Sequence, residues 1–277
     1  MNVHDKWNGQ DWRWIDHSSS GLQYHPLQSF ALDDTLCTSV GEGISDPVMR
    51  SWVHSPTVVL GIQDSRLPYI MDGCRYLEEQ GYRVIVRNSG GLAVVLDEGI
   101  YNLSIIMKED RGISINSGYD FMWELMKEVF SDAPLPIEAY EVVGSYCPGT
   151  YDLSMGGRKF AGISQRRIRG GIAVQIYLAV TEYGEERAEL LKKFYDIAVQ
   201  GAPVRYEWPR INPKVMSSLS ELYGTPLDIQ DVTKRLLTTV VYTHGARLQT
   251  STLTPKELQQ FDSLYQRVVD RNDKALT

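Results

Sequence analysis

Cys147 lies in a loop of small and polar residues, 144–149, with the sequence GSYCPG. Most free cysteines are buried small hydrophobes, and Cys37 and Cys74 fit that description because both lie in helical patterns. A lone thiol in a loop is more typical of a functional group, and cysteine is a common nucleophile. We therefore interpret Cys147 as the candidate catalytic residue.

Lys159 is the candidate partner of that thiol. A free thiol with a pKa of about 8.5 is only a few per cent thiolate at neutral pH. An ammonium group at about 4 Å stabilises a thiolate by up to about 4 kcal/mol at an effective dielectric constant of about 20. One lysine therefore suffices to activate Cys147 if the loop folds back over the neighbouring strands. Otherwise, Lys159 is a solvated lysine on an open face.

The strands around Lys159 are predicted from the paired glycines at 156–157, a two-residue hairpin signal between two short strand patterns. A two-residue turn here pairs Ser154 with Lys159. One position further from the turn, it pairs Leu153 with Phe160. Because side chains alternate across a strand, this register places further side chains on the face of Lys159: Asp152, Ser154 and Ala161.

A second segment, 87–97 with the sequence RNSGGLAVVLD, has the pattern of a strand, a glycine turn and a strand. Paired glycines let a ligand approach the backbone closely, and their N–H groups can hold a carbonyl or an anion. Taken alone, this segment is best interpreted as a plain glycine hairpin turn.

Other catalytic signatures are missing from the sequence. It has no P-loop, no dinucleotide-binding glycine fingerprint, no HExxH zinc motif and no GxSxG nucleophile elbow. The five histidines are scattered without metal-ligand spacing, and the three cysteines form no CxxC pair. We therefore expect no metal and no cofactor, and the odd cysteine count fits a reducing compartment.

The net charge and the first residues of the chain limit where the protein can be located and what it can bind. A net charge of −7 argues against general nucleic-acid binding, which demands a basic surface. The first residues lack the apolar core of a signal peptide, and no stretch approaches the roughly 20 apolar residues that cross a bilayer. We expect a cytoplasmic protein that binds neither nucleic acid nor membrane.

The order of patterns predicts an α+β protein. Short strand patterns that follow one another without intervening helices favour a mixed or antiparallel sheet, and helical patterns flank them. After residue 210 the patterns predict only helices, the last of which begins with a capping box at 254–257. We expect a catalytic domain over 1–209 and a helical extension over 210–277 that packs on it.

These segments resemble the biotin/lipoate protein ligase and octanoyltransferase superfamily over most of residues 25–200. Lipoate ligases carry arginine, two small polar residues, three glycines, Ala-Val, an aromatic residue, histidine and aspartate in the first segment. Here Leu92 replaces the third glycine, Val95 the aromatic residue and Leu96 the histidine. Lys159 matches the active-site lysine of the superfamily. The resemblance implies a mixed, mainly antiparallel sheet flanked by helices.

The departures favour one branch. Adenylating ligases use the glycine segment for ATP and need no cysteine, whereas a cysteine in the loop before the lysine hairpin resembles the amidotransferase branch. The resemblance then implies that Cys147 takes an octanoyl or lipoyl group from a lysine of glycine cleavage H protein as a thioester, without ATP. A lysine of an E2 lipoyl domain of a 2-oxoacid dehydrogenase accepts the group, and Lys159 activates the thiol and transfers protons at the amines.

The resemblance also implies a set of substrate-binding residues around the acyl group: Arg87, Ser89, Gly90, Gly91, Ala93, Tyr146, Gly162 and Ser164. Three alternatives remain open. The acyl donor can be an acyl carrier protein, the chain can be an ATP-dependent lipoate ligase, or it can be a non-catalytic protein that binds acyl carriers. The last alternative predicts full function after Cys147→Ala.

Overall fold

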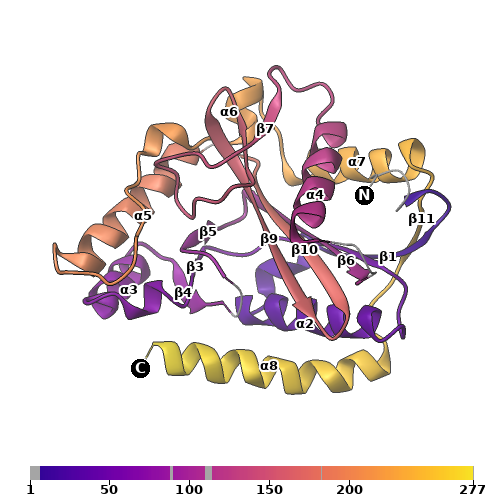
Figure 1. Ribbon diagram of the computed structural model, residues 1–277, viewed down its shortest axis with the longest axis horizontal. Coiled ribbons are helices and arrows are strands. Elements are labelled where there is room, and N and C mark those ends of the chain that lie inside the picture. The colour runs from indigo at the N-terminus through magenta and orange to yellow at the C-terminus, as the bar shows by residue number, and fades with distance from the viewer. Residues whose placement is uncertain (1–6, 88–89, 110–113, 182, 277) are drawn as a thin grey trace.

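The main sheet runs through the centre of the molecule (Figure 1). The computed structural model describes residues 7–87, 90–109, 114–181 and 183–276. From edge to edge, the strands are β11 (Arg247–Thr250), β1 (Asp11–His17), β2 (Val48–Trp52), β6 (Ile100–Lys108), β10 (Gly171–Ala179), β9 (Arg158–Ile168), β8 (Asp152–Met155) and β7 (Ile137–Ala139). β1 is parallel to β2 and β11, while the pairings from β2 to β7 are antiparallel. The expected mixed, mainly antiparallel sheet flanked by helices is confirmed.

Helices cover both faces of this sheet because its strands are apolar on both sides. In β6, Ile105 packs in one core with Phe121 of α4 (Ile115–Val129), and its neighbour Ile106 packs on the other face with Leu36 of α2 (Pro26–Gly41). The outer helix α8 (Pro255–Ala275) lies along α2 (Figure 1). α2 is therefore buried almost all round, which explains why its carboxylates Asp33 and Asp34 need the arginine partners that they have.

A smaller sheet lies beside the main one, in the order β4 (Arg83–Val86), β3 (Thr57–Leu60) and β5 (Val94–Leu96). Helices α3 (Ile70–Glu79) and α5 (Gly184–Val199) pack against each other on its outer side (Figure 1). β3 is buried over its whole length, as its unbroken run Thr-Val-Val-Leu requires. The glycine segment, residues 90–93, leads directly into β5.

The hairpin of β8 and β9 differs from the predicted register at one position. Ser154 pairs with Lys159 as expected, but Leu153 pairs with Ala161 and not with Phe160. The cause is a β-bulge, in which one strand carries an extra residue opposite its partner. Phe160 and Ala161 both lie in the apolar core, so the expectation that Ala161 shares the face of Lys159 is wrong.

The C-terminal region is not purely helical, contrary to the sequence-based expectation. It contains η3 (Pro213–Val215), α6 (Leu219–Tyr223), α7 (Ile229–Thr238) and η4 (Thr239–Thr243), but β11 then joins the edge of the main sheet beside β1. Neither β1 nor β11 was predicted. β11 is a short edge strand, and its parallel pair with β1 joins the two ends of the chain, so it leaves no hairpin signal.

Contacts of residues 210–277 with the remainder of the chain are close. The capping box at the start of α8 forms as predicted, and its Glu257 also makes a buried ion pair of 2.7 Å with Arg13 of β1. Nearer the middle of the chain, the N–H of Ser217 donates to the carbonyl oxygen of Lys159 at 2.8 Å. The division into two domains at residue 209 stays a prediction. Among the described helices, none is both long enough and apolar enough to span a membrane.

Candidate active site

Cys147 lies in the loop between β7 and β8, at a strained point of the backbone. Its φ angle is +45°, in the left-handed region that residues other than glycine adopt at a cost. The neighbouring Tyr146 is buried, whereas the cysteine is half-buried. The loop therefore leaves the Cys147 side chain partly exposed.

Lys159 holds this strained loop in place. Its ammonium group lies 2.9 Å from each of the carbonyl oxygens of Tyr146 and Cys147, 2.9 Å from a carboxylate oxygen of Asp152 and 3.3 Å from the hydroxyl of Ser145. Its side chain is fully buried. The loop has thus folded back over the hairpin, and Lys159 is not a solvated lysine.

Asp152 is the counter-ion of Lys159. The bulge in β9 places it opposite Gly162, and it accepts hydrogen bonds from the N–H of Val142 at 3.2 Å and the hydroxyl of Ser145 at 3.3 Å. Burial raises the pKa of the Asp152 carboxyl above its usual range, against the opposing effect of the nearby Lys159. A buried ion pair with these further hydrogen bonds is a rigid support for the loop.

The sulfur of Cys147 faces the glycine segment. The N–H of Leu92 lies 3.3 Å from Sγ, and Nη2 of Arg87 lies 3.5 Å from it. The same Nη2 donates to the carbonyl oxygen of Leu92 at 2.6 Å, which fixes the guanidinium group across the turn. A Cβ atom at Gly91 would lie 2.2 Å from Nη2 and 3.2 Å from Sγ, and Gly91 has a φ of +101°, so only glycine fits this position.

Among the described residues, both groups in hydrogen-bond contact with the sulfur are donors, and one of them carries a positive charge. We expected Lys159 to supply this charge, but its hydrogen bonds go to the carbonyl oxygen of Cys147 and not to the thiol. Arg87, which is buried, is the cation in hydrogen-bond contact with Sγ.

A cavity of about 320 Å³ opens beside the thiol. This volume is in the range of small-molecule sites. Its walls include the segment 147–149, the glycine turn, α2, α4 and strands β6, β9 and β10. They are mainly apolar, with a few amide and hydroxyl groups. The lining residues are Phe30, Trp52, Val59, Arg87, Gly90, Gly91, Val94, Leu96, Asn102, Tyr119, Cys147, Pro148, Gly149, Asp152, Gly162, Ile163, Ser164, Gln165, Gln175, Ile176 and Tyr177.

Known proteins share this architecture. The pattern of the lipoyl protein ligase A/B catalytic domain matches residues 25–241. The chain belongs to this family. A relative from Bacillus velezensis, octanoyl-[GcvH]:protein N-octanoyltransferase, is 53% identical over 267 residues, which are 95% of this chain and 93% of the relative. A relative from Listeria monocytogenes, lipoyl-[GcvH]:protein N-lipoyltransferase, is 48% identical over 279 residues and the match covers 100% of each chain. The chain is thus an acyltransferase, as we expected.

Solved structures of the lipoyl ligase family have the same fold. Lipoate-protein ligase A bound with ATP superposes with a TM-score of 0.69 at 17% identity, covering 93% of this chain and 94% of that chain. The bipartite lipoate protein ligase of Thermoplasma acidophilum gives a TM-score of 0.65 at 18% identity, covering 93% and 92%. At these identities the likeness shows the fold alone.

The sequence-predicted site residues of this acyltransferase fall into three groups. Arg87, Gly90, Gly91, Gly162 and Ser164 line the cavity together with Cys147. Ala93 and Tyr146 are buried and do not line the cavity. Ser89 lies outside the described residues. The substrate-binding role of each of these residues stays a prediction.

Several cavity residues were not predicted from the sequence. The clearest are Asn102 in β6 and Gln175 in β10, where single amide side chains interrupt otherwise apolar strand patterns. That interruption is a signal that an inward position meets something polar. Gln175 contacts Ser164 at 3.3 Å, while Asn102 donates to the carbonyl oxygen of Trp52 at 3.1 Å. Both contacts join residues of the cavity lining to one another.

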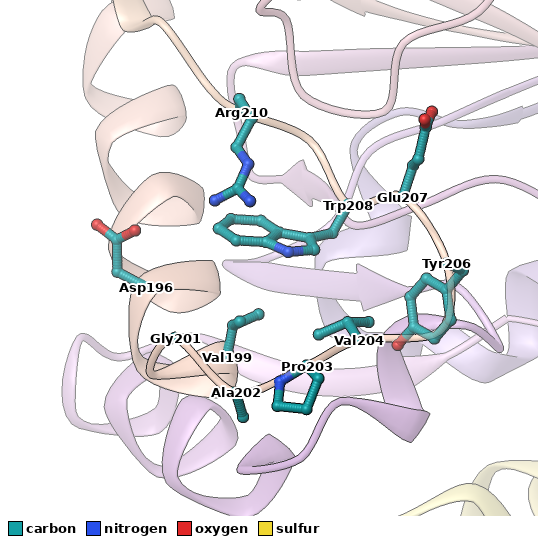
Figure 2. A pocket seen from close by; sticks show the side chains of 10 residues that line it. All are labelled: Asp196, Val199, Gly201, Ala202, Pro203, Val204, Tyr206, Glu207, Trp208 and Arg210. Carbon is teal, nitrogen blue, oxygen red and sulfur yellow. The ribbon is translucent and has the colours of Figure 1, made fainter.

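A larger cavity, of about 710 Å³, lies between the end of α5 and the segment 201–210 (Figure 2). Its most prominent feature is the guanidinium group of Arg210, which stacks 3.7 Å from the ring of Trp208. Neither Cys147 nor Lys159 lines it. We place the candidate active site of the acyltransferase in the smaller cavity because Cys147, the candidate nucleophile, lines that cavity.

Proposed function

We propose that the chain transfers an octanoyl or lipoyl group from the lysine of glycine cleavage H protein to the lysine of an E2 lipoyl domain. The transfer passes through a thioester on Cys147 and uses no ATP. The observation that carries this proposal is the half-buried thiol at the edge of a mainly apolar cavity. The Leu92 N–H and the Arg87 guanidinium are in hydrogen-bond contact with its sulfur. The names of relatives that are about half identical support the carrier protein as donor.

In the first step, the Cys147 thiolate attacks the amide carbonyl carbon of the acyl-lysine. A carbon–sulfur bond forms, and the negative charge moves to the carbonyl oxygen. The Leu92 N–H and Arg87, which lie beside the sulfur, are the donors available to that oxyanion. The carbon–nitrogen bond then breaks, and the lysine leaves as an amine after taking up one proton.

In the second step, the neutral amine of the acceptor lysine attacks the thioester carbonyl. The carbon–sulfur bond breaks, the new amide loses one proton, and the thiolate is restored. One amide replaces another, so the overall free-energy change is small and no nucleotide is needed to drive the transfer. This balance distinguishes the reaction from ATP-dependent ligation.

Lys159 has a structural and an electrostatic role in this proposal. Its ammonium group fixes the peptide on which the nucleophile sits, and its positive charge lies close beneath the loop. Donation of a proton from Lys159 to the leaving lysine requires that the ammonium group exchange one of its carbonyl contacts for the substrate nitrogen.

The test is intact-protein mass spectrometry after mixing the enzyme with octanoylated or lipoylated H protein in the absence of ATP. We expect a hydroxylamine-labile acyl adduct on the wild type, lost in Cys147→Ala and discharged when an E2 lipoyl domain is added. Cys74→Ala is the matched control, because Cys74 is a buried cysteine of α3, and it should keep the adduct. An adduct formed only from acylated acyl carrier protein would move the proposal to that donor. Full transfer by Cys147→Ala would contradict it.

A further inference from the structure

Asp64 is a fully buried carboxylate behind the glycine turn, and the reaction steps above do not use it. It begins the short helix η2 (Asp64–Arg66) after β3 and is 0% exposed. One carboxylate oxygen accepts a hydrogen bond from the N–H of Gly61 at 2.8 Å. The other accepts one from the hydroxyl of Tyr195 at 2.8 Å. A buried carboxylate at the centre of a hydrogen-bonded cluster holds its partners in a fixed geometry.

Tyr195 carries this network from α5 to the turn. Its hydroxyl donates to Asp64 and accepts a hydrogen bond from the N–H of Ala93 at 3.3 Å. The ring is fully buried and stacks against Trp208, with 5.8 Å between ring centroids. Ala93 is the residue after Leu92, whose N–H faces the nucleophile.

Gly61 supports the turn from a second direction. A Cβ atom at Gly61 would lie 1.9 Å from the carbonyl oxygen of Gly91. The backbone of Gly61, which Asp64 holds through its N–H, therefore packs directly against the Gly91 peptide. Asp64 thus acts on both sides of Leu92, through Gly61 on the residue before it and through Tyr195 on the residue after it.

We propose that Asp64 and Tyr195 are positioning residues, which set the Leu92 N–H at the point where it meets the sulfur and the oxyanion formed on it. This inference rests on the proposed function for the identity of the acyl donor. Neither side chain lines the cavity of the nucleophile, so both act through the turn and not by touching substrate. Loss of the tyrosine hydroxyl should leave binding of the donor unchanged and slow the acylation of Cys147.

The test compares Tyr195→Phe with Tyr206→Phe. Both variants remove one hydroxyl from the same region, but the Tyr206 hydroxyl donates to the carbonyl oxygen of Gln63 and does not contact the turn. We expect Tyr195→Phe to lower kcat for thioester formation by about tenfold or more, with KM for octanoylated H protein changed by less than about twofold. Tyr206→Phe should keep both constants. Equal kcat in all three proteins, or an equal loss in both variants, overturns the proposal.

A second measurement does not depend on the acyl donor. Amide hydrogen exchange of a peptide that spans residues 91–93 should be faster in Tyr195→Phe and in Asp64→Asn than in the wild type, and unchanged in Tyr206→Phe. If the wild type forms no acyl adduct while this difference in exchange is found, the proposed function fails and the positioning role stands. If exchange is the same in all proteins, the positioning role fails even when the wild type is active.

Discussion

Cys147, the proposed nucleophile, lies between two supports that are built in different ways. On the cysteine side, Lys159 contacts the loop through partners 12 to 14 positions away in sequence, all within one hairpin and the loop that precedes it. On the glycine side, Ala93 depends on Tyr195, 102 positions away, and Tyr195 depends on Asp64, 131 positions away. The first support is local, whereas the second exists only after α5 and η2 have packed behind the turn.

From this difference we can predict how each side responds to mutation. The cysteine side concentrates its contacts in one buried ion pair, so that removing one partner leaves a charge alone in the interior. The glycine side spreads its contacts over a hydroxyl, a carboxylate and a close backbone approach. We expect mutations on the cysteine side to lower the stability of the fold strongly. Mutations on the glycine side should mainly displace the turn that faces the thiol.

The largest effect is expected from Lys159→Met. The change leaves Asp152 buried without its cation, and we expect the free energy of unfolding to fall by about 3–5 kcal/mol, together with loss of thioester formation. Urea denaturation and mass spectrometry measure the two effects. The double variant Lys159→Met/Asp152→Asn removes the unpaired charge, so it should recover part of the stability but not the activity. A single variant as stable as the wild type would contradict the local support.

Gly61→Ala tests the close approach on the glycine side. The added methyl group would overlap the Gly91 carbonyl at 1.9 Å, which must displace the turn, and misplacement by about 1 Å can cost about 100-fold in rate. We expect the rate of acylation of Cys147 to fall about 10- to 100-fold. Gly90→Ala is the comparison, because a Cβ atom there would have no atom of the described residues within 4 Å, and its effect should be several-fold smaller. A larger loss in Gly90→Ala would argue against the turn geometry described here.

The smallest effect is the pH dependence of stability that Asp64 contributes. Burial raises the pKa of its carboxyl to about 6, although Arg87 and the hydrogen bonds from Gly61 and Tyr195 oppose that rise, and Tyr206 also lies nearby. A carboxyl whose folded-state pKa is raised destabilises the folded state once both states are ionised. The cost is absent below a pH of about 4 and complete above a pH of about 6.

Asp64→Asn should remove this pH dependence. The difference in unfolding free energy between the wild type and the variant, measured by urea denaturation at pH 4 and at pH 7.5, should shift in favour of the variant at the higher pH. A constant difference across that range would show that the buried carboxyl does not titrate as described. Acylation of Cys147 by the variant should still be slower at pH 7.5, where the wild-type side chain is a carboxylate, because the amide cannot accept both hydrogen bonds.

Much of the fold was predictable because its signals are local. The start of α8 follows from a capping box within its own segment, and the pairing of Ser154 with Lys159 follows from the glycine turn between them. The bulge at Phe160 was not predictable in this way. An extra residue in one strand is set by what its side chain finds in the core, and that depends on helices far away in sequence.

The sequence alone supplied the candidate groups of the site: a loop thiol at Cys147, a lysine hairpin after it and paired glycines that let a ligand approach the backbone. Each of these features depends on residue types at short spacing. Which groups contact the sulfur follows from the tertiary structure alone. Lys159 donates its hydrogen bonds to carbonyl oxygens of the loop, whereas Arg87 and the Leu92 N–H face the thiol. Contacts such as that between Tyr195 and Asp64 join segments more than a hundred residues apart, and such contacts leave no periodic pattern in a sequence.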